Sequence, residues 1–163
     1  MKLVLLALGA AIVAAGLFFG LWLNSRTTSP AEIDETLANE APEVRSVATE
    51  IVELLVNVDA ARLEAASERV LELSTGNFRS DYESLLPGLG PAFEEAGATA
   101  TGEIVEGPDI TFSASEEAFA IAKVAQTTTV DDTERTVGFT VRLTMVKEGE
   151  EWKADRFELL GEL

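Results

Sequence analysis

The first marked pattern along the chain is a continuous apolar stretch. Residues 3–23 hold 21 positions without a charged side chain. As a helix this stretch would span about 31 Å, enough to cross the hydrocarbon core of a bilayer. A cleaved signal peptide usually has a shorter apolar region of about 7–15 residues, and no small-x-small cleavage site follows here. We therefore predict that residues 1–24 form an uncleaved membrane anchor.

The orientation of this anchor is predicted from what lies on either side of it. Basic residues are nearly balanced, with Lys2 before the apolar stretch and Arg26 after it. A short N-terminal stub normally stays in the cytoplasm, and the sizeable domain follows the anchor. We expect a single-pass cell-membrane protein with a cytoplasmic N-terminus and an extracytoplasmic (periplasmic-side) C-terminal domain. Trp22 would then lie at the outer interface, where indole rings are favoured.

Glycines recur along the predicted membrane helix. Gly16 and Gly20 form a GxxxG pair, and Gly9 lies one heptad earlier. Small residues on one helix face let a second helix approach closely. The three glycines are therefore candidate positions for packing against another membrane helix. Glycine is also common in membrane helices generally, and that explanation stays equally open.

A stalk helix is predicted directly after the anchor. Ser29 can cap it, Pro30 suits its first position, and Glu32 completes a capping box. Pro42 is expected to interrupt this helix, because proline has no N–H to donate within a helix. We assign residues 25–43 to a juxtamembrane stalk.

A folded domain is predicted over residues 44–163, and its first segment has a strong helical period. Apolar side chains recur there every three or four positions, which is typical of a helix with one buried face. The residues that carry this period are Val44, Val47, Ala48, Ile51, Val52, Leu55 and Val58.

Two more helices are predicted, joined at "LELSTGNFRSDY". Asp59 is well placed to cap the first, which runs to about Leu73. Gly76 falls where a helix end favours positive φ, and Asn77 or Ser80 can cap the next helix. The stretch lacks the lysine and the preceding strand of a phosphate-binding loop, so we predict a corner.

The last of these helices has an apolar face that ends in a run rich in proline and glycine. The run at residues 87–91 is expected to kink or end the helix. Phe78 and Tyr82 are expected to point into the core. The apolar face comprises Phe78, Tyr82, Leu85, Leu86 and Leu89.

The period then changes to two. Residues 136–147 alternate apolar with threonine, glycine or arginine, which indicates a half-buried strand. Residues 116–130 are apolar on both faces at first, as in a partly central strand. Residues 99–112 form a weaker strand broken by Gly107-Pro108, and 152–160 form the last one. Helices followed by antiparallel strands predict an α+β domain, with the helices on one face of a curved meander of about four strands.

Composition changes this picture mainly by exclusion. The chain has no cysteine and no histidine, so it can build neither a Ser-His-Asp triad nor a His/Cys zinc site. All 29 acidic residues and ten of the twelve basic ones follow residue 26. Such a field repels phosphate backbones and anionic headgroups, so we expect no nucleic-acid partner and a domain that stands off the membrane. Solubility or a salty habitat explains the charge equally well.

Taken together, these features resemble a known family. The anchor, an amphipathic helix, an Asp-Ala-Ala-Arg helix start, "STGNFRSDYESLL" and the closing "EWKADRFELL" follow the order seen in the Mce-associated membrane proteins of actinobacteria. Gly76, Phe78 and Tyr82 match that family's threonine–glycine–aromatic–tyrosine corner, and Trp152 matches its closing tryptophan. The resemblance covers about residues 3–160 and rests on order and spacing.

The resemblance implies an accessory role rather than catalysis. Members of this family are associated with mammalian-cell-entry (Mce) systems, which move lipids or sterols across the cell envelope. The implied partners are Mce transporter subunits or their permease. The implied fold is a nuclear-transport-factor-like, or cystatin-like, roll. No catalytic residue, cofactor or metal is implied, so we expect no enzyme.

Two other functions are less well supported by the residues. A lipid or hydrophobic-ligand carrier would need a pocket between sheet and helices, although aromatics at such spacing more often fill a core. An isomerase of the ketosteroid type would need an inward carboxylate base, which the expected strand register does not supply. The candidate pocket residues are Tyr82, Phe93, Phe119, Phe139 and Trp152.

The sequence does not determine whether one further surface contacts a partner or only water. It is a threonine-rich face on the predicted strands. Its members are Thr127, Thr128, Thr129, Thr140 and Thr144.

Overall fold

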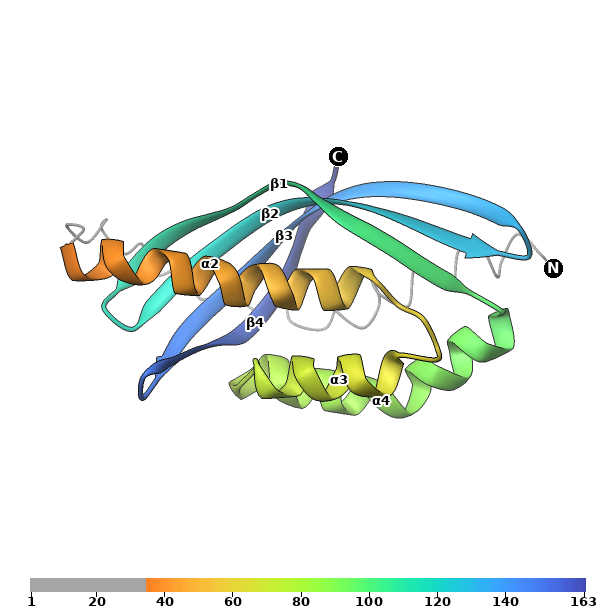
Figure 1. Cartoon of the computed structure of the whole chain (residues 1–163), viewed down its shortest axis with the longest axis horizontal. Coiled ribbons are helices and arrows are strands. Elements are labelled where there is room, and N and C mark those ends of the chain that lie inside the picture. Colours follow the sequence, from red (N-terminus) through yellow and green to blue (C-terminus); the bar gives the residue numbers. More distant parts are fainter. Residues whose placement is uncertain (1–34) are drawn as a thin grey trace.

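The computed structural model describes residues 35–163, and within them helices precede strands (Figure 1). The helices are α2 (Glu35–Val56), α3 (Leu63–Glu72) and α4 (Gly76–Ala96). The strands are β1 (Thr99–Ala114), β2 (Glu117–Val130), β3 (Thr133–Glu148) and β4 (Glu151–Glu162).

The strands form one antiparallel meander in the order β1-β2-β3-β4. Figure 1 shows the sheet arched over the three helices, which lie on its concave side. β2 and β3 are the central strands, and on β3 the residues buried between 139 and 145 alternate with partly exposed ones. The predicted α+β architecture, with helices on one face of a curved four-stranded meander, is confirmed.

β1 differs from its prediction in length and continuity. The strand runs from Thr99 to Ala114 and does not break at Gly107-Pro108. Its pairing with β2 instead shifts register between Ile104 and Glu106 and again before Asp109. Such bulges absorb extra residues without ending a strand, and Gly107 adopts the φ of +87° that this irregularity needs. The predicted break is therefore wrong.

α2 differs from prediction at Pro42, which lies inside the helix rather than ending it. Proline leaves the carbonyl of Ala38 without its usual N–H donor. Both Ala38 and Pro42 are exposed, so water can solvate that carbonyl. The predicted interruption is therefore wrong, because the carbonyl that loses its donor lies at an exposed position and the helix can continue. The helix also crosses the assigned stalk–domain boundary at residues 43 and 44.

α4 likewise continues through its proline and glycine run and ends at Gly97, which has a φ of +57°. In Figure 1 the second half of α4 turns away from the line of its first half. Of the two outcomes predicted for residues 87–91, the kink is therefore confirmed and the early end of the helix is wrong. Pro87 and Pro91 are both exposed, so the carbonyls that they leave unpaired face water.

The corner before α4 also differs in detail from its prediction. α4 begins at Gly76, so Asn77 and Ser80 lie in its first turns and neither caps it. The Ser80 hydroxyl instead donates to the carbonyl of Gly76 at 3.1 Å. Asp59 does not cap α3, whose N-cap residue is Arg62. Its Oδ1 instead accepts the N–H of Ala61 at 3.0 Å, in the turn that precedes the helix.

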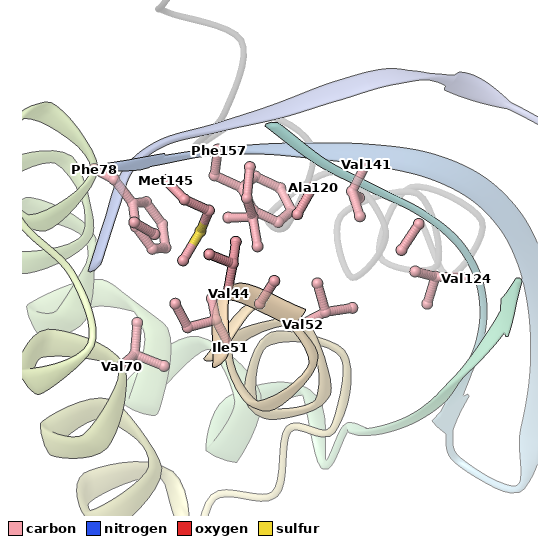
Figure 2. Packing of buried hydrophobic residues seen from close by; sticks show 14 of the residues in the cluster. Val44, Ile51, Val52, Val70, Phe78, Ala120, Val124, Val141, Met145 and Phe157 are labelled. Carbon is pink, nitrogen blue, oxygen red and sulfur yellow. The ribbon is translucent and has the colours of Figure 1, made fainter. Parts of the chain in front are cut away.

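The core lies between α2 and the concave face of the sheet. Figure 2 shows Val44, Ile51 and Val52 of α2 directed at side chains from the strands, including Val124 and Val141. Each such side chain contributes about 1.5–3 kcal/mol when it is fully removed from water. A smaller cluster of Phe93, Ala98 and Ala100 lies where α4 leads into β1.

Candidate functional site

The three helices leave the convex face of the sheet uncovered, and strand side chains alternate onto it away from the helices. Ile121 of β2 lies on this face with 38% of its surface exposed. Arg142, its cross-strand partner on β3, pairs with Glu158 of β4 through an Nη2–Oε2 contact of 2.7 Å. The Arg142 guanidinium also lies 5.6 Å from the ring centroid of Phe119. An aromatic ring, an aliphatic side chain and an ion pair thus form the centre of the convex face.

The predicted threonine-rich face divides between the two sides of the sheet. Thr127, Thr129, Thr140 and Thr144 alternate onto the convex face, and the hydroxyls of Thr127 and Thr136 lie 2.7 Å apart. Thr128 is buried on the concave side. The grouping of all five threonines on one face is therefore wrong, because residues 127, 128 and 129 alternate along an unbroken strand.

The first turns of α2 are joined to the β3–β4 hairpin by a polar contact. Glu40 Oε1 accepts from Lys147 Nζ at 2.7 Å, and Glu40 Oε2 accepts from the indole N–H of Trp152 at 3.0 Å. Lys147 and Trp152 are cross-strand partners, and Trp152 is only 2% exposed. The hydrogen bond from Lys147, reinforced by that from Trp152, lowers the pKa of the Glu40 carboxyl against the opposing effect of partial burial. We call Glu40, Lys147 and Trp152 the α2–hairpin contact.

The α3–α4 corner contains Gly76, Phe78 and Tyr82, which carry the family resemblance in this part of the sequence. The Phe78 ring lies 6.0 Å from that of Tyr82 and stacks on Phe157 of β4 at 5.9 Å. The Tyr82 hydroxyl hydrogen-bonds Ser67 at 3.3 Å, and burial raises the pKa of Tyr82. All four side chains are buried. The stretch is thus a packed corner and not a ligand loop.

Gly76 has two separate reasons to be glycine. Its φ is +52°, a region in which other residues are strained. A Cβ at this position would also lie 1.8 Å from Oδ1 of Asp155, on β4. The Asp155 carboxylate thus stands beside the N-terminus of α4, where negative charge is favourable.

The five aromatics considered as a pocket do not converge. Tyr82, Phe139 and Trp152 belong to the main core, whereas Phe93 belongs to the smaller cluster. Phe119 points to the convex face, where it meets Arg142. A ligand pocket lined by all five is therefore wrong, and four of the five fill the core, as the alternative explanation predicted.

Gly9, Gly16 and Gly20, like the rest of the predicted anchor, lie outside the described residues. Within residues 35–163 no helix combines the length and the apolarity needed to span a bilayer.

Two polar contacts were missed from the sequence. Glu40 was assigned to the juxtamembrane stalk, although it follows Leu37 and precedes Val44 at helical spacing, which was an available signal. Asn57, just after α2, accepts the N–H of Gly102 at 3.0 Å and donates to its carbonyl at 3.1 Å. Nothing in the local sequence pairs residues so far apart, so only the fold reveals this contact.

No protein-family model matches the chain, and no curated protein matches it. Solved structures do resemble it. The VirB8 protein of Agrobacterium tumefaciens matches with a TM-score of 0.61 and 15% identity over 82% of this chain and 96% of the other. An IcmL-like type IV secretion system protein from Legionella pneumophila matches with a TM-score of 0.61 and 10% identity over 75% and 92%.

A third similar structure is described by its fold. It is an NTF2-like protein with a cystatin-like fold from Novosphingobium aromaticivorans, with a TM-score of 0.54 and 17% identity over 77% of this chain and 83% of the other. The predicted nuclear-transport-factor-like roll is therefore confirmed as the fold. At such identities the likeness concerns the fold alone.

Proposed function

We propose that the chain is a membrane-anchored accessory subunit of a transport complex in the cell envelope and acts through protein–protein contacts. The observation that carries this proposal is the combination of a predicted anchor at residues 3–23 with a roll like that of the IcmL-like type IV secretion system protein. The anchor would hold the roll on the extracytoplasmic side, with the N-terminus in the cytoplasm.

The finer form of the proposal names the complex. The resemblance to Mce-associated membrane proteins supports Mce transporter subunits or their permease as the partners, and lipid or sterol as the cargo. Gly9, Gly16 and Gly20 would form the membrane part of the contact. The convex face around Ile121 and Arg142 offers apolar, aromatic and charged groups for a contact outside the membrane. No catalytic step is part of the proposal.

Complex size in the native membrane tests the coarser form. The chain has a mass of 17.4 kDa, so alone it would migrate in a mild-detergent extract as one chain plus a micelle. We expect it to migrate in a much larger species by native electrophoresis. Replacing Gly16 and Gly20 by Leu should shift part of it to the small species, whereas Leu at Ala10 and Ala14 serves as a matched control. Migration of the unaltered chain only as the small species would contradict the accessory role.

A further inference from the structure

α2 has a weak point at Pro42. In an unbroken helix every N–H donates to the carbonyl four residues earlier, but Pro42 cannot donate to Ala38. Kinks in helices are found at such positions. The backbone hydrogen bonds therefore hold residues 35–41 to the rest of α2 less firmly than they hold any later turn.

The two sides of Pro42 are attached to the roll in different ways. On the C-terminal side, Val44, Ala48 and Ile51 are all 0% exposed and fix that part of α2 in the main core. On the N-terminal side, Leu37 is 8% exposed and Glu40 makes the bonds to Lys147 and Trp152. Among the described side chains of these early turns, Glu40 is the one that bonds to the roll, through the α2–hairpin contact.

The receiving groups of this contact are themselves held in place. Trp152 packs edge-on against Phe112, with ring centroids 5.8 Å apart. The backbone N–H of Lys147 donates to the carbonyl of Glu116 at 3.0 Å, which ties the β3 end to the β1–β2 turn. Glu40 therefore binds a rigid site, and its bonds define one direction for the start of α2.

We infer that residues 35–41 form an arm that is hinged at Pro42 and latched to the β3–β4 hairpin by Glu40. When the latch is closed, the arm continues the line of α2. When it is open, the arm swings about Pro42 while the rest of the helix stays in the core. The consequence at the membrane rests on the proposed function: the latch sets the angle at which the chain leaves the roll toward its anchor.

Distance measurements between spin labels test this device on the full chain in lipid nanodiscs. The chain contains no cysteine, so two introduced cysteines are its only thiols. Labels at Ala38→Cys and Thr111→Cys, both exposed positions, report the arm against β1. Labels at Glu53→Cys and Thr111→Cys report the part of α2 beyond Pro42 and serve as the matched control. Each pair is compared with and without Glu40→Gln.

We expect Glu40→Gln to broaden the 38–111 distance distribution and to leave the 53–111 distribution unchanged. Ala38 lies about 6 Å along the helix from Pro42, so swings of tens of degrees move its label by several ångströms. Adding Pro42→Ala restores the missing hydrogen bond and should narrow the 38–111 distribution again. An unchanged 38–111 distribution in Glu40→Gln would overturn the latch. Broadening of both pairs, or no narrowing with Pro42→Ala, would overturn the hinge. Neither failure would bear on the accessory role.

Discussion

Replacing Gly76 by alanine should destabilise the roll more than the same change at any glycine with room for a side chain. The position combines a φ of +52° with the Asp155 carboxylate at 1.8 Å from where the new Cβ would lie. Gly97, at the other end of the same helix, has a φ of +57° and nothing within 4 Å of an added Cβ. Alanine at Gly97 therefore introduces backbone strain alone, whereas alanine at Gly76 introduces the same strain and a steric clash with Asp155.

The expected costs follow from these two geometries. Left-handed backbone costs an alanine about 1–2 kcal/mol, which is the whole effect expected for Gly97→Ala. Gly76→Ala must also displace Asp155, at about 0.5–1.5 kcal/mol for a strained rotamer. It further loses the favourable charge beside the start of α4, worth about 0.3–1 kcal/mol. We expect about 2–4 kcal/mol for Gly76→Ala.

Thermal unfolding of the full chain in detergent measures this difference. Trp22→Phe leaves Trp152 as the only tryptophan, and its buried indole reports the unfolding of the roll. At about 4 °C per kcal/mol for a domain of this size, Gly76→Ala should lower Tm roughly twice as far as Gly97→Ala.

A variant that carries both Asp155→Ala and Gly76→Ala tests the contribution of the steric clash. With Asp155→Ala already present, adding Gly76→Ala should cost no more than Gly97→Ala does. Equal Tm values for Gly76→Ala and Gly97→Ala in the natural background would refute the reasoning.

Two further predictions concern the core and the α2–hairpin contact. Ile51→Ala, at a position 0% exposed, should cost about 2–5 kcal/mol, whereas Ile121→Ala on the convex face should stay within about 0.5 kcal/mol; similar losses in urea unfolding would contradict the assignment of faces. The stability that Glu40 contributes should be complete above its ordinary pKa of 4.5 and fall as pH drops through its lowered folded pKa, because protonation removes the charge bonded to Lys147. The charges of Glu43 and Glu116 also interact with Lys147, so Glu40→Gln should reduce the fall in Tm at acid pH without abolishing it. An unchanged dependence of Tm on pH in this variant would contradict the α2–hairpin contact.

The fold was predictable because its signals are local and redundant. The alternation in β3 and the helical period of α2 each depend on burying one face. The structure buries the alternating residues from Phe139 to Met145 and the stripe from Val44 to Val52, whereas Val58 lies beyond the end of α2. The interruption at Pro42 and the early end of α4 were predicted wrongly because a propensity rule ignores whether the freed carbonyl can be solvated. Pro42, Pro87 and Pro91 are all exposed, so the carbonyls that lack their usual donor are open to solvation.

The candidate surfaces were less predictable than the fold. Phe119 is an aromatic within an apolar run, and only the register of β2 shows that it faces away from the core toward Arg142. Glu40 is bonded to residues more than a hundred positions later, and no local pattern specifies such a pairing. Trp152 was singled out from the resemblance, but its hydrogen bond to Glu40 could be seen only once α2 and β4 were placed.

The central claim is most directly tested by purifying the chain from its native membrane. A C-terminal tag, mild detergent and quantitative identification of whatever copurifies would give both the partners and their proportions. We predict Mce transporter subunits or their permease in near-stoichiometric yield. Recovery with subunits of a different membrane complex would contradict the Mce assignment, and recovery of the chain alone would contradict the accessory role itself.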